Sequence, residues 1–125
     1  MINRKRNFDL IREILFVIEN SPPNQPVVSN QLNIDGYDFG VIFLHVEMLK
    51  GAGFIEADTQ RTLSGGGAIL IKQITWKGYE FLDNARNDNI WKKVKAEAEK
   101  KGSSVSMAVL NGLLLAAAKK YVGLD

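Results

Sequence analysis

The segment Leu44–Ile55 (LHVEMLKGAGFI) constrains the fold more than any other part of the chain. Its pattern predicts the last turns of an amphipathic helix, a stop at Gly51 and Gly53, and the start of a strand. Asp38 is placed to cap this helix at its N-terminus. One helical face is predicted from apolar spacing at Val41, Leu44, His45, Met48 and Leu49. The same spacing predicts a structural role for His45 near the core.

Further elements follow from local patterns. We expect a strand at Phe54–Asp58, followed by a flexible hairpin tip at Thr59–Gly67. A return strand rich in β-branched residues is expected at Ala68–Ile74. A first helix is expected from about Asn7 to Asn20, ended by the proline-rich segment that follows. Val27–Tyr37 fits a short helix and an extended segment about equally well, and the sequence leaves both open.

The C-terminal third is predicted to be helical. Thr75 is expected to cap a helix at Trp76–Arg86, and a second helix is expected at Ile90–Lys101 with a stop at Gly102. Ser103 or Ser104 would then cap a last helix that runs to about Tyr121.

Two motifs resemble bacterial repressors of the arsenic-sensing and MarR-like types. His45-Val46-x-x-Leu49-x-x-Ala52-Gly53-Phe54-Ile55 resembles the signature that joins their recognition helix to the wing, and Ile74-Thr75-x-x-Gly78 resembles the motif that ends the wing. The resemblance implies a winged helix-turn-helix. Where those repressors present small polar residues to bases, this chain has Ile42 and Phe43.

A closer resemblance covers nearly the whole chain. Four segments are similar to a bacterial and phage-associated family that is catalogued as a domain of unknown function. These segments are Phe8–Arg12, Ile34–Tyr37, Thr75–Asp83 and Trp91. This resemblance implies a winged-helix fold and a prophage context, and it implies no established activity or catalytic residues.

The expected fold class is therefore α+β and mainly α: a winged helix-turn-helix with a two-stranded wing and additional C-terminal helices. The expected domains are a winged-helix domain at residues 1–87 and a helical extension at 88–125. The chain has no cysteine and one histidine, which excludes disulfides and argues against metal sites, cofactors and nucleophilic catalysis. No apolar run reaches about 18 residues, so a cytoplasmic protein without membrane spans is expected.

Charge leaves the function open. Residues 1–87 carry nine Lys and Arg against ten Asp and Glu, whereas a nucleic-acid domain is usually basic over its binding face. Within the helix at residues 38–50, Lys50 is the one side chain of a type that reads bases. If this helix does not face DNA, its apolar side chains are either packed inside the fold or bound to a protein partner. These side chains are Phe39, Ile42 and Phe43. The candidate phosphate contacts are Arg4, Lys5, Arg6, Lys50, Arg61, Lys72 and Lys77.

The last helix predicts self-association. Ala108, Gly112 and Ala116 are four residues apart and share a side with room for a close neighbour, and Leu113 adds apolar surface. Either this helix is clamped within the fold or it is buried in a homodimer, which is the preferred interpretation. The preferred function is that of a phage or prophage regulator that binds DNA, and its expected ligand is double-stranded DNA. The alternatives are a winged-helix module for protein–protein interaction and a phage accessory protein without a DNA role.

Overall fold

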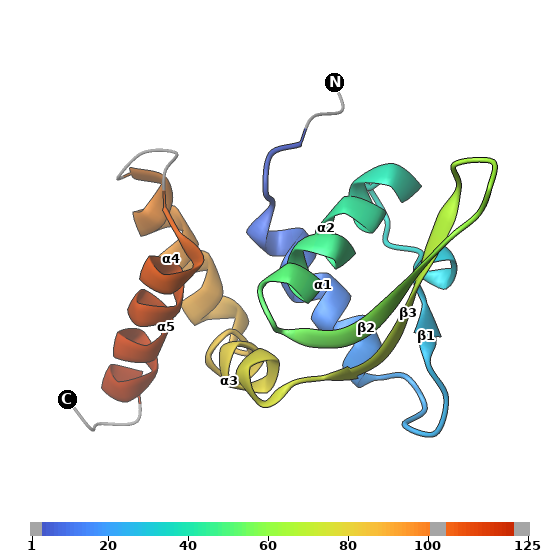
Figure 1. Ribbon diagram of the computed structural model, residues 1–125. Coiled ribbons are helices and arrows are strands. Elements are labelled where there is room, and N and C mark those ends of the chain that lie inside the picture. The colour runs from blue at the N-terminus through green and yellow to red at the C-terminus, as the bar shows by residue number, and fades with distance from the viewer. Residues whose placement is uncertain (1–3, 101–104, 122–125) are drawn as a thin grey trace. The chain divides into compact units, whose positions relative to one another are not determined.

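The computed structural model describes residues 4–100 and 105–121 of the 125-residue chain. Over these residues the protein is α+β and mainly helical, with five α-helices, one turn of 3-10 helix and a three-stranded antiparallel sheet (Figure 1). The expected α+β class is confirmed. None of the described helices is long and apolar enough to cross a membrane.

The chain divides into two compact units, Met1–Tyr79 (unit 1) and Glu80–Asp125 (unit 2). Their border lies within α3 (Trp76–Asn84), whereas the sequence-based boundary after residue 87 lies between α3 and α4 (Asp88–Lys100). Each unit is described below by itself.

Helix α1 (Phe8–Glu19) lies within the range expected from the sequence, about Asn7 to Asn20. The Asn7 side chain accepts a hydrogen bond from the Leu10 backbone N–H at 3.1 Å, which satisfies one of the free donors of the first turn. Asn20 is the C-cap residue, and prolines follow it. The buried apolar side chains recur at helical spacing and form the centre of the unit 1 core: Leu10, Ile11, Ile14, Leu15 and Ile18.

The segment that the sequence left open contains almost no regular helix. Val27–Val28 form the short strand β1, and Ser29–Gln31 form a single 3-10 turn, η1. The Ser29 hydroxyl is buried and accepts a hydrogen bond from the Ile69 backbone N–H at 2.9 Å, so this turn is fixed to strand β3. That long-range contact, which no local pattern reveals, favours the extended alternative over a regular helix.

Helix α2 (Phe39–Gly51) follows, and its buried face differs from the predicted one. Val41, Leu44 and Met48 are only half-buried, although they were predicted to share the core face with His45 and Leu49. The buried residues are instead Ile42, His45, Val46 and Leu49. Because this helix is apolar on nearly every side, its sequence could not fix the orientation, and packing against α1 and the sheet decides it. Asp38 is the N-cap residue, but its side chain makes no capping hydrogen bond.

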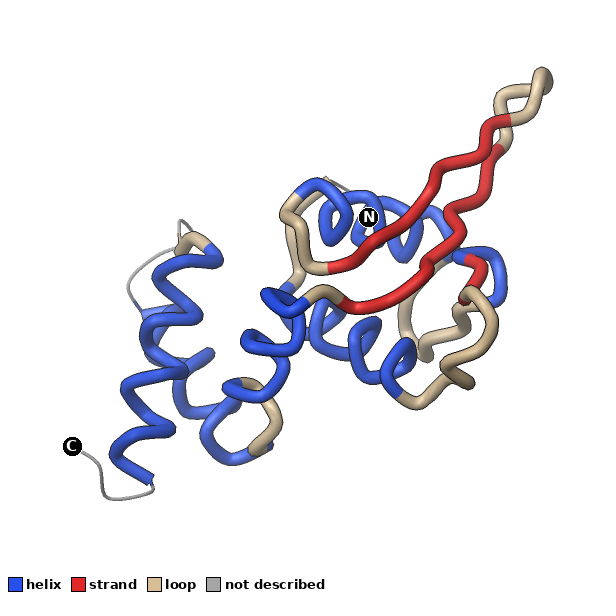
Figure 2. The backbone as a smooth tube through the Cα atoms, turned by 60° about the horizontal axis from the view of Figure 1, so that its bottom comes forward, coloured by secondary structure: helices blue, strands red, loops and turns tan. Residues whose placement is uncertain are grey.

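The sheet has the order β1-β3-β2 and is antiparallel. Strands β2 (Ile55–Arg61) and β3 (Gly67–Ile74) form the predicted hairpin, and β2 runs three residues further than the expected strand. Helices α1 and α2 cover one face of this sheet, where Ile69 and Ile71 are buried (Figure 1). The distal half of the hairpin extends beyond these helices (Figure 2).

Unit 2 contains the rest of α3, helix α4 and helix α5 (Met107–Tyr121). Phe81 packs edge-on against Trp91 with ring centroids 6.2 Å apart, and the Asn84 amide donates to the Asn111 amide oxygen at 3.2 Å. The buried residues of α4 recur at helical spacing: Trp91, Val94 and Ala98. Helix α3 ends at Asn84 rather than at Arg86.

Helix α5 begins later than the sequence suggested. The Ser106 hydroxyl accepts the Val109 backbone N–H at 3.1 Å, as a capping residue does. The predicted stop at Gly102 and the predicted caps Ser103 and Ser104 lie outside the described residues. Leu110 and Leu114 are the buried contacts of this helix.

Candidate nucleic-acid interface

The outward side of α2 changes character along its length. Near its N-terminus, Phe39 is 50% exposed and its ring lies 6.0 Å from the half-buried ring of Phe43. Near its C-terminus, Glu47 is half-buried and Lys50 is exposed. The apolar part and the charged part of this helix are therefore separate, and the residues of the first turns offer no hydrogen-bond donors to a base edge.

Ile42 does not belong to that outward side. Its side chain is only 2% exposed and packs in the core of unit 1. The expectation that Ile42 would help to bind a partner is therefore wrong, because its position on α2 turns it towards α1 and the sheet. Phe39 and Phe43 remain as surface residues.

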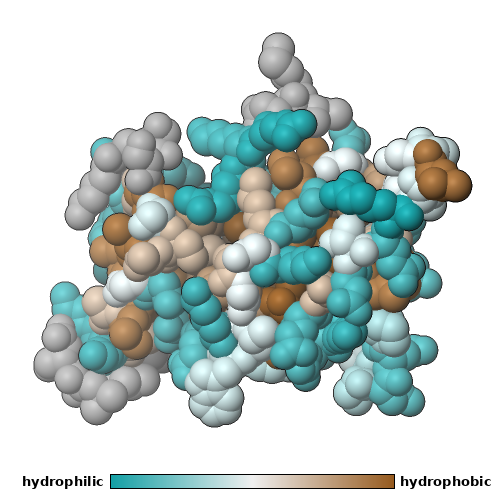
Figure 3. All heavy atoms as spheres, in the orientation of Figure 1, coloured by the Kyte–Doolittle hydropathy of each residue, from teal (hydrophilic) through white to brown (hydrophobic). Residues whose placement is uncertain are grey.

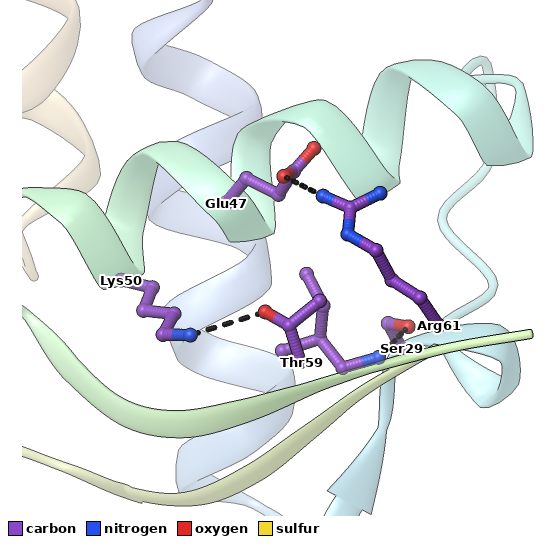
Figure 4. Close-up of polar contacts among 6 residues, drawn as sticks. Ser29, Glu47, Lys50, Thr59 and Arg61 are labelled. Carbon is purple, nitrogen blue, oxygen red and sulfur yellow. Dashed lines mark hydrogen bonds and ion pairs between the residues drawn. The ribbon is translucent and has the colours of Figure 1, made fainter. Parts of the chain in front are cut away.

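Two predicted cations lie between α2 and the hairpin. The Lys50 ammonium donates to the Thr59 hydroxyl at 3.1 Å, and Arg61 lies 3.8 Å from the Glu47 carboxylate (Figure 4). The Glu47–Arg61 pair is well exposed, at 40% and 70% for the two side chains. A pair this exposed contributes little to stability, so Arg61 can exchange Glu47 for another anion. Lys50 is held by a neutral hydroxyl, so it too can pair with an external anion.

The N-terminal basic segment begins beside α2. The Asn7 backbone N–H donates to His45 Nε2 at 2.8 Å, and its side-chain amide donates to the Tyr37 hydroxyl at 3.3 Å. These bonds hold the start of α1 against α2. The exposed residues Arg4, Lys5 and Arg6, called the basic arm below, precede this anchor directly. The Arg6 guanidinium lies 4.7 Å from the centroid of the Phe8 ring.

His45 has the structural role that its position predicted. Its side chain is fully buried, and Nδ1 lies 2.8 Å from the Val41 carbonyl oxygen. Because the Asn7 N–H can only donate, Nε2 accepts and Nδ1 carries the proton that is donated to Val41. Both ring nitrogens are thus used within the fold, and neither is directed at a ligand.

Lys72 and Lys77 do not join the cations beside α2. Lys72 lies on the sheet face opposite to α1 and α2, since its neighbour Ile71 points into the core. Its ammonium pairs with Asp58 at 2.9 Å. The hydrogen bond to Asp58, assisted by Coulombic attraction, raises the pKa of Lys72 above its ordinary 10.5. Lys77 donates to the Ala52 carbonyl oxygen at 3.2 Å.

Sequence reasoning missed the partners of these residues. Thr59, Glu47, Tyr37 and Asn7 hold the candidate cations or the basic arm in place, but none of them is near its partner in sequence. The sequence does contain a signal for a further surface residue that was missed: Leu63 is an apolar residue among the polar and glycine residues of the hairpin tip. Among the described residues no three His, Asp or Glu side chains gather as metal ligands.

Helix α5 offers a second candidate surface, on unit 2. Ala108, Gly112 and Ala116 are exposed, as is needed for a close approach by another helix, and Leu113 is half-buried. Val109 and Leu115 are also exposed, at 51% and 45%. The side opposite to Leu110 and Leu114 is therefore apolar and exposed among the residues of unit 2 that the structure describes.

Comparisons with known proteins place the chain in a family. Residues 5–104 match the family described as "Hypothetical protein (DUF2513)", and the chain belongs to it. An "Uncharacterized protein" of Haemophilus influenzae is 32% identical over 103 residues, which cover 82% of this chain and 86% of that protein. No solved structure matches the chain. The predicted membership in a family of unknown function is confirmed.

Proposed function

We propose that unit 1 is a winged-helix module that binds double-stranded DNA mainly through phosphate contacts. The order of elements supports this proposal: a helix, a short strand, a turn, a second helix and a hairpin, with the sheet order β1-β3-β2. The 3-10 turn at Ser29–Gln31 stands where a helix-turn-helix has its second helix. The proposal concerns a binding module and not an enzyme.

One observation carries the proposal: basic groups converge on α2 from two directions. The Asn7 contacts with His45 and Tyr37 hold the residue that directly follows the basic arm against this helix, and Lys50 and Arg61 lie between the helix and the hairpin. A helix in the major groove with an arm and a hairpin beside it would place these cations near phosphates.

The same geometry argues for weak sequence preference. Phe39 and Phe43 occupy the outward side of the first turns of α2, where a recognition helix usually carries polar base readers. Lys50 lies near the other end. Affinity would therefore come from charge, with base discrimination well below the roughly 1–3 kcal/mol of a good bidentate contact.

Salt dependence of binding tests the proposal. Anisotropy of a labelled duplex is measured across a salt series for the wild type and for the triple variant Arg4→Gln, Lys5→Gln, Arg6→Gln. If all of the arm residues contact phosphates, the log–log slope falls by about 2.7. The control is Lys72→Gln, which removes one positive charge where the triple variant removes three, and which lies on the opposite sheet face.

A further variant probes the internal ion pair. Glu47→Gln removes the carboxylate that lies 3.8 Å from Arg61, so it should tighten duplex binding. Absence of duplex binding by the wild type at low salt would reject the proposal. The single-charge variant Arg61→Gln is compared with Lys72→Gln, and equal weakening by the two would reject the assigned face.

Homodimer formation through α5 is part of the proposal. The exposed apolar side of this helix, with Val109 and Leu115 beside the small residues Ala108, Gly112 and Ala116, supports a second copy of the chain as its partner. Two DNA-binding units in one dimer would double the number of phosphate contacts and steepen the salt dependence.

A second candidate function is protein binding, favoured by the exposed aromatic pair on α2. Phe39 is half-exposed and its ring lies 6.0 Å from the tilted ring of Phe43, and aromatic side chains are frequent anchors of protein interfaces. Phe39→Ser should leave the fold intact because the ring is already in solvent. If Phe39→Ser still binds duplex DNA but no longer binds a protein partner, protein binding through the aromatic pair is favoured.

A further inference from the structure

The apex of the β2–β3 hairpin is an ordered turn that holds a leucine in solvent. The Thr62 N–H donates to the Gly66 carbonyl oxygen at 2.8 Å, and the Gly65 N–H donates to the Thr62 carbonyl oxygen at 3.1 Å. The Thr62 hydroxyl also lies 3.0 Å from that of Ser64. Leu63 contributes to none of these bonds and is fully exposed. Figure 3 shows an apolar group at this end of the hairpin.

The turn does not need a leucine at this position. Its hydrogen bonds come from Thr62, Ser64 and glycines, and turn tips generally favour Gly, Asn, Asp and Ser. A single exposed apolar residue is ordinary on a protein surface. This one, however, lies at the end of a hairpin that extends beyond the rest of unit 1 (Figure 2), where it would be the first group to meet a partner.

The charge around Leu63 favours an anionic partner. Between Thr59 and Ile69 the chain contains no carboxylate, and its one charged side chain is Arg61. The Arg61 side chain is 70% exposed and points along the same side of the hairpin as Thr59. The apex is thus an apolar tip with the cation Arg61 behind it, in a stretch from Thr59 to Ile69 that carries no other charge.

We infer that Leu63 is a wedge that enters the DNA minor groove and inserts between two base pairs, while Arg61 contacts a flanking phosphate. This inference rests on the proposed DNA-binding function. Apolar side chains of this kind unstack a base step and bend the duplex in minor-groove binding proteins. Residues Gly65–Gly67 carry no side chains, so the return side of the apex adds little width.

A protein pocket fits the same observations less well. A stable protein interface buries about 800 Å² on each partner, far more than one leucine at the end of a hairpin supplies. A wedge between base pairs acts instead as a single side chain, with affinity coming from phosphate contacts elsewhere. The observations therefore favour duplex DNA as the partner of this apex.

Fluorescence of 2-aminopurine placed within a duplex tests the insertion, because this base analogue brightens when it is unstacked. The wild type and Leu63→Met should raise the signal on binding, and Leu63→Ser should leave it at the level of the free duplex. A duplex with one mismatch, whose stacking is already weakened, should bind the wild type roughly fivefold tighter than the matched duplex and should bind Leu63→Ser equally. Because Leu63 makes no contact within the fold, the variants should have the circular dichroism and Tm of the wild type.

The outcomes separate the two ideas. If the wild type binds duplex DNA but its 2-aminopurine signal and mismatch preference equal those of Leu63→Ser, the wedge is wrong and the DNA-binding function stands. If the wild type binds no duplex at low salt, both are wrong. If Leu63→Ser changes self-association in sedimentation but not the duplex signal, the apex is a protein contact and the wedge is wrong.

Discussion

Gly78 lies at a point where α3 approaches the preceding strand too closely for any side chain. A Cβ built on Gly78 would overlap the carbonyl oxygen of Phe54, and it would lie 2.6 Å from Ile74 Cγ2 and 3.1 Å from the Phe54 carbonyl carbon. The same carbonyl oxygen accepts the Thr75 N–H at 3.0 Å. The Thr75 hydroxyl in turn donates to the Gly53 carbonyl oxygen at 2.6 Å. Gly78→Ala must therefore push the start of α3 away from the residues that fix it.

The expected cost follows from these contacts. Overpacking of this kind costs about 1–3 kcal/mol. Stretching the two Thr75 hydrogen bonds adds about 1 kcal/mol for each one lost. The higher helix propensity of alanine compared with glycine offsets about 1 kcal/mol of this loss of stability. We expect Gly78→Ala to reduce the free energy of unfolding by about 2–4 kcal/mol, and to lower the Tm by about 10 °C.

Urea denaturation followed by circular dichroism measures this change. The matched control is Gly40→Ala in α2, where a Cβ would meet nothing within 4 Å. The control should stabilise the protein by about 0.5 kcal/mol, so the same substitution has opposite signs at the two sites. A Gly78→Ala variant as stable as the wild type, with an unchanged m-value, would refute the reasoning.

Three further changes have expected outcomes. His45→Leu leaves the Asn7 N–H without its acceptor and should lower the free energy of unfolding by about 1–3 kcal/mol in urea denaturation; no loss would contradict the assigned bond. Lys72 should titrate above 10.5 by NMR and return towards 10.5 in Asp58→Asn. Because the folded pKa is raised, the stabilisation from this pair is fully present below about 10.5 and is lost as the pH rises through the folded pKa. Leu115→Glu should convert a dimer into monomers in sedimentation; a monomeric wild type would end the dimer proposal.

The elements that sequence predicted well are those fixed by neighbouring residues. Thr75 caps α3 as predicted, since its hydroxyl accepts the Gly78 N–H at 3.1 Å. The β2–β3 hairpin lies where β-branched residues and glycines predicted it. Gly53 has φ of 79°, as expected for the residue that ends α2. Such signals act over three or four residues and need no knowledge of the rest of the fold.

The candidate site was only partly predictable. The exposed basic arm and the cations Lys50 and Arg61 were identified from residue type, but their grouping depends on contacts between distant segments. Lys72 was predicted together with them, and the pleat of β3 places it on the other face of the sheet. Residue type alone does not predict which cations share a surface.

By itself, the sequence determined the α+β class, the family, most helix and strand positions and the inert role of His45, because caps, breakers and apolar spacing act locally. Only the tertiary structure decided which side of α2 is buried, that Val27–Gln31 forms a strand and a 3-10 turn, and which charges neutralise one another. A helix as apolar as α2 has no preferred face until α1 and the sheet supply one. Arg61 likewise acquires Glu47 as its partner only when β2 folds back towards that helix.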